Sequence, residues 1–451
     1  MDPDSSHDRA SETPPGSPAS PDGAGGRLPV GASAEEGATG LLLRCREQGL
    51  AEEQAADLAQ VDPHAILQLE GQESRIASRA MVVFAALGRG NLDLADQALA
   101  LDLPVDPQRP EQRLLDLSAR LYRACVGAER DPSQPQAVMN ALTEALLPVL
   151  QLQTAEARLA RGYAGLTFSE ALLRVGDVGA ARQQLESVAD EAGMPPGITV
   201  IAGMLLGGIE QAVGRSDLAL GHIQLALHRA TQLGVTSDEE RLLRLILVAL
   251  LLADSKRLGL AMLDDVRSGK YGAAPSGHGT VARLYHLLSL IASSGGDADV
   301  PSPSLGSSAS GSPAAAPGGS KPPGTLAQPV QPGQPEDPHV VLLRRLALNS
   351  ELSWLQGRHN SAGWSLLLAS MSAGALSGMG DQCGAYGVLV EAAADLRCRY
   401  MDGVADLCDR QIAMLRHQLG PDAFEGLIAE AQRRRHELRV RRLAMQTERL
   451  R

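Results

Sequence analysis

The chain has 451 residues, a net charge of −12 and only 2% aromatic residues. Dedicated nucleic-acid-binding proteins present an excess of basic side chains, so this charge argues against direct nucleic-acid binding. The apolar residues are mainly Leu, Ala and Val, and Ala and Leu are strong helix formers. The composition therefore predicts an all-α fold.

Cysteine content and hydropathy indicate the compartment. Five cysteines are scattered along the chain without a CxxC pair, a number and spacing typical of reduced, buried thiols: Cys45, Cys125, Cys383, Cys398 and Cys408. No stretch of 18 apolar residues predicts a membrane span, and the N-terminus lacks the apolar core of a secretory signal. We expect an intracellular, cytoplasmic protein.

The first part of the chain divides into a tail and a helical block. Residues 1–38 are rich in Pro, Gly, Ser and Ala, and cannot bury enough surface to offset the entropy of ordering. We predict a disordered tail there. Helical periodicity then extends over residues 39–292, and Gly90 opens a degenerate first copy of a turn pattern that recurs later.

The clearest repeat covers residues 159–230, which predict two consecutive helical hairpins. In each, a turn Gly precedes a small residue at +5, an aliphatic residue at +9 and a small or β-branched residue at +12. The two copies are Gly176, Ala181, Leu185 and Val188, and Gly214, Ala219, Ile223 and Ala226. Small residues let helices approach closely, so the pattern indicates stacked helix pairs.

A second helical block follows a long interruption. Residues 239–266 and 281–291 predict further helices, the first apolar on nearly all sides. Residues 293–338 are Ser, Gly, Pro and Ala throughout and predict a disordered linker or insert. The turn pattern returns at Gly357 within the block 339–420, which favours one continuous solenoid over two lobes. It returns again at Gly380, too close for both copies to be complete repeats.

The chain ends in a basic, amphipathic helix over residues 421–451. Its arginines include four that we single out as candidate partner-binding residues: Arg434, Arg435, Arg439 and Arg442. Three interpretations stay open. The helix caps the fold in solvent, docks an acidic partner, or contacts a nucleic acid or membrane surface.

The spacing of the hairpins resembles the tetratricopeptide repeat, a helix–turn–helix unit of about 34 residues. This resemblance implies an α-solenoid whose concave face, formed by the first helix of each pair, binds a peptide or helical protein. The corresponding candidate residues are Glu170, Arg174, Glu210 and Gln211. Aliphatic residues fill most of the family's aromatic positions here.

Two further resemblances are weaker. The block from Leu376 to the Arg-rich helix looks like the end of the helical partner subunit of the cohesin loader, which would imply sister chromatid cohesion and a nuclear location. The stretch Leu419–Phe424 also looks like the end of the repeat arm of large bacterial signalling ATPases, which would imply a regulatory arm. These point to different kingdoms, so the organism and pathway stay open.

Motifs that carry chemistry are missing from the sequence. It contains no GxxxxGK[ST] phosphate loop, no HExxH and no Cys/His cluster at zinc spacing. We therefore predict no catalytic, cofactor-binding or metal-binding residue, and a non-enzymatic scaffold or adaptor for a protein partner. An enzyme using His or Asp in the loop 268–279 is the alternative. The oligomeric state is left open.

Overall fold

The computed structural model describes residues 34–48, 57–127, 134–232, 237–272, 275, 279–294, 338–358 and 361–449. These residues form helices and no strand, which confirms the all-α fold. Helix α1 begins at Ala34, inside the stretch 1–38 for which a disordered tail is predicted. The rest of that prediction, and nearly all of the predicted linker 293–338, lies outside the described residues.

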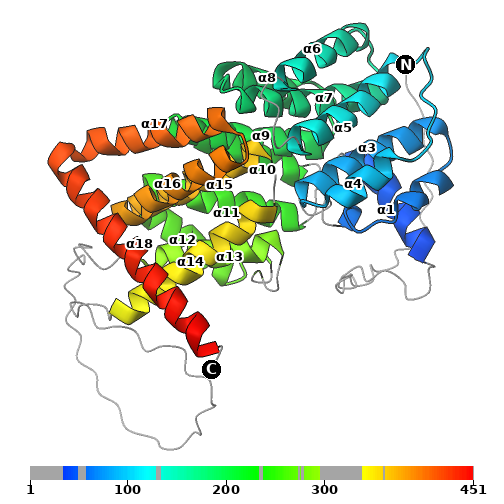
Figure 1. Cartoon of the computed structure of the whole chain (residues 1–451). Coiled ribbons are helices and arrows are strands. Elements are labelled where there is room, and N and C mark those ends of the chain that lie inside the picture. The colour runs from blue at the N-terminus through cyan, green and yellow to red at the C-terminus, as the bar shows by residue number, and fades with distance from the viewer. Residues whose placement is uncertain are drawn as a thin grey trace, which may run out of the picture.

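Antiparallel helix pairs make up most of the structure (Figure 1). After α1 (Ala34–Gln48) and η1 (Pro63–Gln68), the pairs are α3 (Gln72–Gly88) and α4 (Leu92–Leu99), α5 (Pro110–Gly127) and α6 (Gln134–Leu146, continued by η2, Leu147–Val149), α7 (Ala155–Arg174) and α8 (Val178–Asp190), α9 (Pro196–Ala212) and α10 (Ser216–Gln232), α11 (Ser237–Asp254) and α12 (Lys256–Arg267), α13 (Thr280–Ala292) and α14 (Pro338–Arg358), α15 (Ala362–Gly378) and α16 (Gln382–Cys398), and α17 (Asp402–Leu419) and α18 (Pro421–Arg449).

Local backbone chemistry explains the repeated turn. Gly176, Gly214 and Gly380 all have positive φ, between 80° and 89°. In each case the next residue's N–H donates to a carbonyl five residues back, at 2.8–3.0 Å, which closes the helix C-terminus. Asp177 and Asp381 then cap the following helix. At these two turns, the Gly-Asp dipeptide thus ends one helix and starts the next.

The structure resolves the conflict between the two late copies of the pattern. Gly357 lies inside α14, so it is not the turn of a hairpin. Gly380 lies in the turn that joins α15 to α16, and these two helices pack along each other. The spacing after Gly357 therefore matches the turn pattern without marking a hairpin turn, whereas the spacing after Gly380 marks one. The next turn, between α16 and α17, uses Tyr400 at φ 56° instead of Gly, which no sequence pattern indicated.

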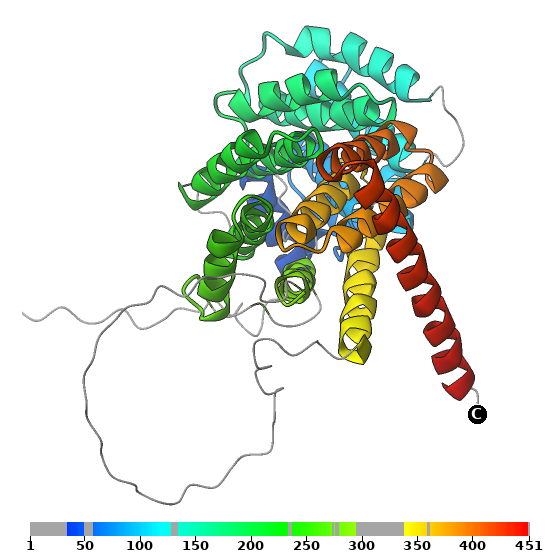
Figure 2. The same cartoon turned by 90° about the vertical axis from the view of Figure 1, so that its left-hand side faces the viewer.

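Helix α15 occupies the middle of the molecule (Figure 2). It packs along α9 and α11 and also contacts α7, all of which are first helices of their pairs, while α17 contacts α7 and α9. Fourteen of the 17 residues of α15 are buried. A helix that is apolar on every side is stable only when other helices cover it on every side. The space between α7, α9, α11 and α16 provides this cover for α15.

Glycines allow the C-terminal helices to reach this depth. A Cβ on Gly378 of α15 would collide with the backbone carbonyl of Leu252 in α11. A Cβ on Gly403 of α17 would collide with the backbone of Gly176, at the turn between α7 and α8. In both cases the added Cβ would meet backbone atoms, which cannot rotate away as the end of a side chain can.

We expect Gly403→Ala to lower the free energy of unfolding by about 1–3 kcal/mol through overpacking. The control is Gly387→Ala in α16, where an added Cβ meets no atom within 4 Å. That change should stabilise the protein by roughly 1 kcal/mol, because Ala favours a helix over Gly. Urea denaturation measures both. Equal effects of the two substitutions would show that α17 does not pack on the turn as described.

Candidate partner-binding surfaces

The structure places the four predicted concave-face residues in different surroundings. Glu170 and Gln211 lie against α15, and Arg174 pairs with Glu170. Glu210 turns the other way, toward Arg182 of α8, because adjacent helical residues point in different directions. Glu170, Arg174 and Glu210 are buried. Partner binding by these residues stays a prediction. For Glu170, Arg174 and Gln211 it would require α15 to move away from this face.

Glu170 holds the N-terminus of α15 in place. Its carboxylate accepts the backbone N–H of Ala362 at 2.8 and 3.0 Å and the hydroxyl of Ser361 at 3.0 Å. Arg174 donates to the same carboxylate at 3.0 Å. A carboxylate at a helix N-terminus satisfies donors that lack a partner within the helix and matches the positive end of its dipole. Glu170 therefore acts as a second cap of α15, although it lies 192 residues before Ala362 in the chain.

Displacing α15 would expose a large apolar surface. Trp364, the three leucines at 366–368 and Met371 are each at most 4% exposed. Burying side chains of this size contributes about 1.5–3 kcal/mol each. A partner would have to replace most of that free energy to take the place of α15. The face formed by α7, α9 and α11, which we call the inner face, is therefore occupied by α15 of the same chain.

We expect Glu170→Gln to lower the free energy of unfolding by about 1–3 kcal/mol, since it removes a buried charge that pairs with Arg174 and caps α15. Glu156→Gln on the same helix is the matched control. Glu156 pairs with Arg46 at 3.1 Å, and both side chains are 30% exposed, so its loss should cost less than about 1 kcal/mol. Thermal and urea denaturation measure both. A smaller effect at Glu170 than at Glu156 would contradict the capping role.

Glu186, Glu210 and His222 form a cluster that no sequence motif indicated. Their ligand atoms lie within 4.8 Å of one another, close enough to hold a cation. Arg215 Nε, however, lies 2.6 Å from one oxygen of Glu210, and Arg182 Nη1 lies 3.7 Å from the other. Two guanidinium groups already balance the two carboxylates, so we interpret the cluster as an ion-pair network.

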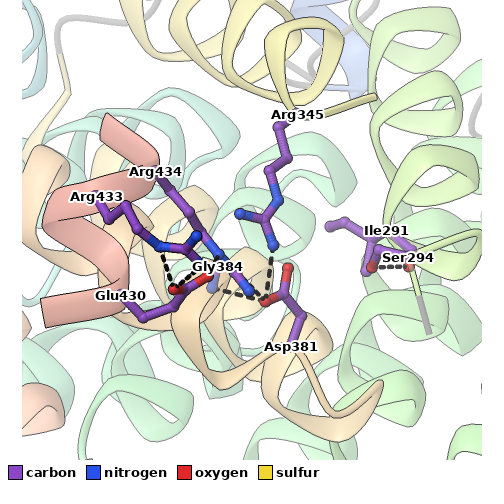
Figure 3. Close-up of polar contacts among 8 residues, drawn as sticks. All are labelled: Ile291, Ser294, Arg345, Asp381, Gly384, Glu430, Arg433 and Arg434. Carbon is purple, nitrogen blue, oxygen red and sulfur yellow. Dashed lines mark hydrogen bonds and ion pairs between the residues drawn. The ribbon is translucent and has the colours of Figure 1, made fainter. Parts of the chain in front are cut away.

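A second network joins α14, α16 and α18 (Figure 3). Asp381, the N-cap of α16, accepts the N–H of Gly384 at 2.9 Å through Oδ1. The same oxygen lies 3.5 Å from Arg345 Nη2 of α14 and 3.3 Å from Arg434 Nη1 of α18. Arg434 also pairs with Glu430, which in turn pairs with Arg433. One carboxylate oxygen thus ties three helices together.

A cleft of about 200 Å³ lies beside this network, between α14, α16 and α18. Leu348, Leu376 and Val388 are buried residues in its wall. Arg345, Arg434 and Arg435 are among its polar lining residues, which also include Asp381 and Glu391. Burial lowers the pKa of Arg345, the charge of Asp381 opposes that shift, and the nearby Arg434 adds to it. The lining thus carries three arginines against two carboxylates.

Two of the four predicted arginines of the last helix line this cleft. Arg434 is half-buried in the network, and Arg435 is 58% exposed and lies 3.8 Å from Glu391. Arg439 is exposed one turn further along α18, and the side chain of Arg442 lies outside the described residues. Sequence reasoning missed Arg345 and Asp381, because neither stands in a pattern that indicates contact with the last helix.

No family profile, curated protein or solved structure matches this chain. Among the described helices, none has both the length and the apolar character needed to cross a membrane. Function must therefore be argued from the surfaces themselves.

Proposed function

We propose that the chain is a non-enzymatic, tetratricopeptide-like scaffold or adaptor that binds a protein partner through its C-terminal face. The observation that carries the proposal is the placement of α18. This helix packs on α16 and α17 and then runs on beyond them, away from the body of the molecule (Figures 1 and 2). Its outer half carries the exposed side chains of Arg435, Arg439 and Val440.

Charge supports an acidic partner. The last 19 residues contain eight Arg and two Glu, a net charge of +6 on a chain whose total is −12. A basic surface on an acidic protein steers acidic partners and orients them. Dedicated nucleic-acid-binding proteins carry an excess of basic side chains overall, whereas this chain is acidic overall. Of the three interpretations of this helix, docking of an acidic partner is therefore the one that we propose.

The hairpin geometry supports the tetratricopeptide-like part of the proposal. The turns at Gly176 and Gly214 and the buried small residues that follow them are features of stacked helical repeats. No observation favours the cohesin-loader subunit or the bacterial signalling arm, so the proposal names no pathway.

The enzyme alternative gains no support from the described residues of the loop 268–279. There, Lys270 pairs with Asp265 at 2.5 Å, and the ring of Tyr271 lies under the guanidinium of Arg244 at 4.0 Å. These contacts hold Lys270 and Tyr271 in place. His278 lies outside the described residues.

We expect the combined substitution Arg435→Glu, Arg439→Glu and Arg442→Glu to reduce partner capture at least tenfold. The tagged full-length chain is expressed in cells of its source organism, and co-purifying proteins are quantified by mass spectrometry. The control carries Arg113→Glu, Arg257→Glu and Arg267→Glu, the same change of charge at exposed positions of α5 and α12.

The control should retain a stoichiometric partner. Chemical cross-linking of that complex should join α18 to a partner segment rich in Asp and Glu. Equal capture by both variants would remove α18 from the binding surface. Turnover of a metabolite by the isolated chain, without any stoichiometric partner, would overturn the scaffold proposal.

A further inference from the structure

We propose that the cleft between α14, α16 and α18 recognises one apolar side chain of an acidic protein segment, while the arginines at its rim hold the adjacent carboxylates. This inference rests on the proposed function and names the chemistry of its partner. It assigns recognition to the cleft, including Arg435 at its rim, whereas the charges of Arg439 and Arg442 further along α18 supply general attraction.

The size and lining of the cleft suit a side chain. Its volume of about 200 Å³ is below the roughly 300–1,000 Å³ of pockets for whole small molecules. The buried residues Leu348, Leu376 and Val388 provide an apolar wall. An exposed apolar side chain of a partner would lose contact with water there, which is the main source of affinity in such a contact.

The arginines of the rim share a small number of carboxylate oxygens. Each guanidinium carries five N–H donors, Arg434 is shared between Asp381 and Glu430, and Oδ1 of Asp381 also serves Arg345 and the backbone N–H of Gly384. Arg435 and Glu391 are 3.8 Å apart and mostly in solvent, so their pair contributes little. An incoming carboxylate can therefore form charge-assisted hydrogen bonds without displacing Asp381.

The combination of pocket and rim favours a protein over a nucleic acid. A nucleic acid needs a row of phosphate contacts, while this cleft offers one apolar pocket and a short arc of cations. Exposed Arg435 and Arg439 continue the positive charge along α18, as an acidic segment lying on that helix would require.

One glycine allows the cleft to be filled without disturbing the fold. Gly387 of α16 lines the cleft, and a Cβ built on it meets no atom within 4 Å. Gly387→Leu should therefore occupy the cleft, and it also replaces a poor helix former with a good one. The matched control is Gly221→Leu in α10, which is exposed and likewise has open space around its Cβ.

The probe is a pool of fluorescein-labelled peptides in which Glu residues flank one Leu, Met, Phe or Trp. Fluorescence anisotropy with the full-length chain measures the affinity for this pool. A second pool with Gln in place of Glu and a single-stranded oligonucleotide are measured in parallel. We expect the Glu pool to bind at least tenfold more tightly than the Gln pool and more tightly than the oligonucleotide.

Two kinds of variant test the two parts of the site. Gly387→Leu should weaken binding of the Glu pool at least tenfold, and Gly221→Leu should leave it unchanged. Arg434→Gln should remove most of the preference for Glu over Gln, whereas Arg267→Gln, at an exposed arginine of α12, should not. Circular dichroism and the melting temperature confirm that each variant is folded.

Failure of this inference differs from failure of the scaffold proposal. If Gly387→Leu binds the Glu pool as well as the unsubstituted chain, or if no peptide binds at 1 mM, the cleft is not a recognition site. Partner capture that still depends on the outer arginines of α18 would then leave the scaffold proposal standing. Tighter binding of the oligonucleotide than of the Glu pool would overturn the assignment to a protein partner.

Discussion

The packing of α15 against α7, α9 and α11 is the interaction on which the rest of the structure depends. It places an apolar helix where the resemblance to tetratricopeptide repeats predicts an open concave face, and Glu170 fixes its start by capping Ala362. Because α13 packs on α14 and α11 packs on α15, the helices before residue 295 and after residue 337 form one body. The interruption between them separates two parts of the sequence, and both parts contribute to the same core.

Filling the inner face decides which surfaces remain for a partner. The C-terminal helices pack from the inside outward. Helix α15 is buried and α16 packs on it, while α17 contacts the turn at Gly176 and α18 lies on the outside. Arg345 and Arg434 both lie near Oδ1 of Asp381, and the same oxygen caps the N-terminus of α16. The folding of the core and the geometry of the arginine cleft are thus linked through one N-cap residue. In the scaffold that we propose, the interior provides stability and the C-terminal edge contacts the partner.

Local features of the fold could be predicted from sequence, and long-range ones could not. The hairpins at Gly176 and Gly214 follow from a glycine with positive φ and from buried small residues a fixed number of positions later, all within one hairpin. The basic character of α18 is likewise a local property. By contrast, the cap from Glu170 to Ala362 and the contact from Arg345 to Arg434 join segments far apart in the chain, and no spacing rule indicates them. The prediction of a concave binding face supposes that this face is open, whereas α15 covers Glu170, Arg174 and Gln211 there.

Amide hydrogen exchange measured by mass spectrometry tests the central claim most directly, because α15 is either a permanent part of the core or a removable occupant of the inner face. If it belongs to the core, peptides from 366–375 should exchange at least about a thousandfold more slowly than peptides from the outer half of α18. That protection should persist when a partner is bound. Exchange of 366–375 as fast as that of α18, or loss of its protection on partner binding, would contradict the account and show that the inner face is the site where partners bind.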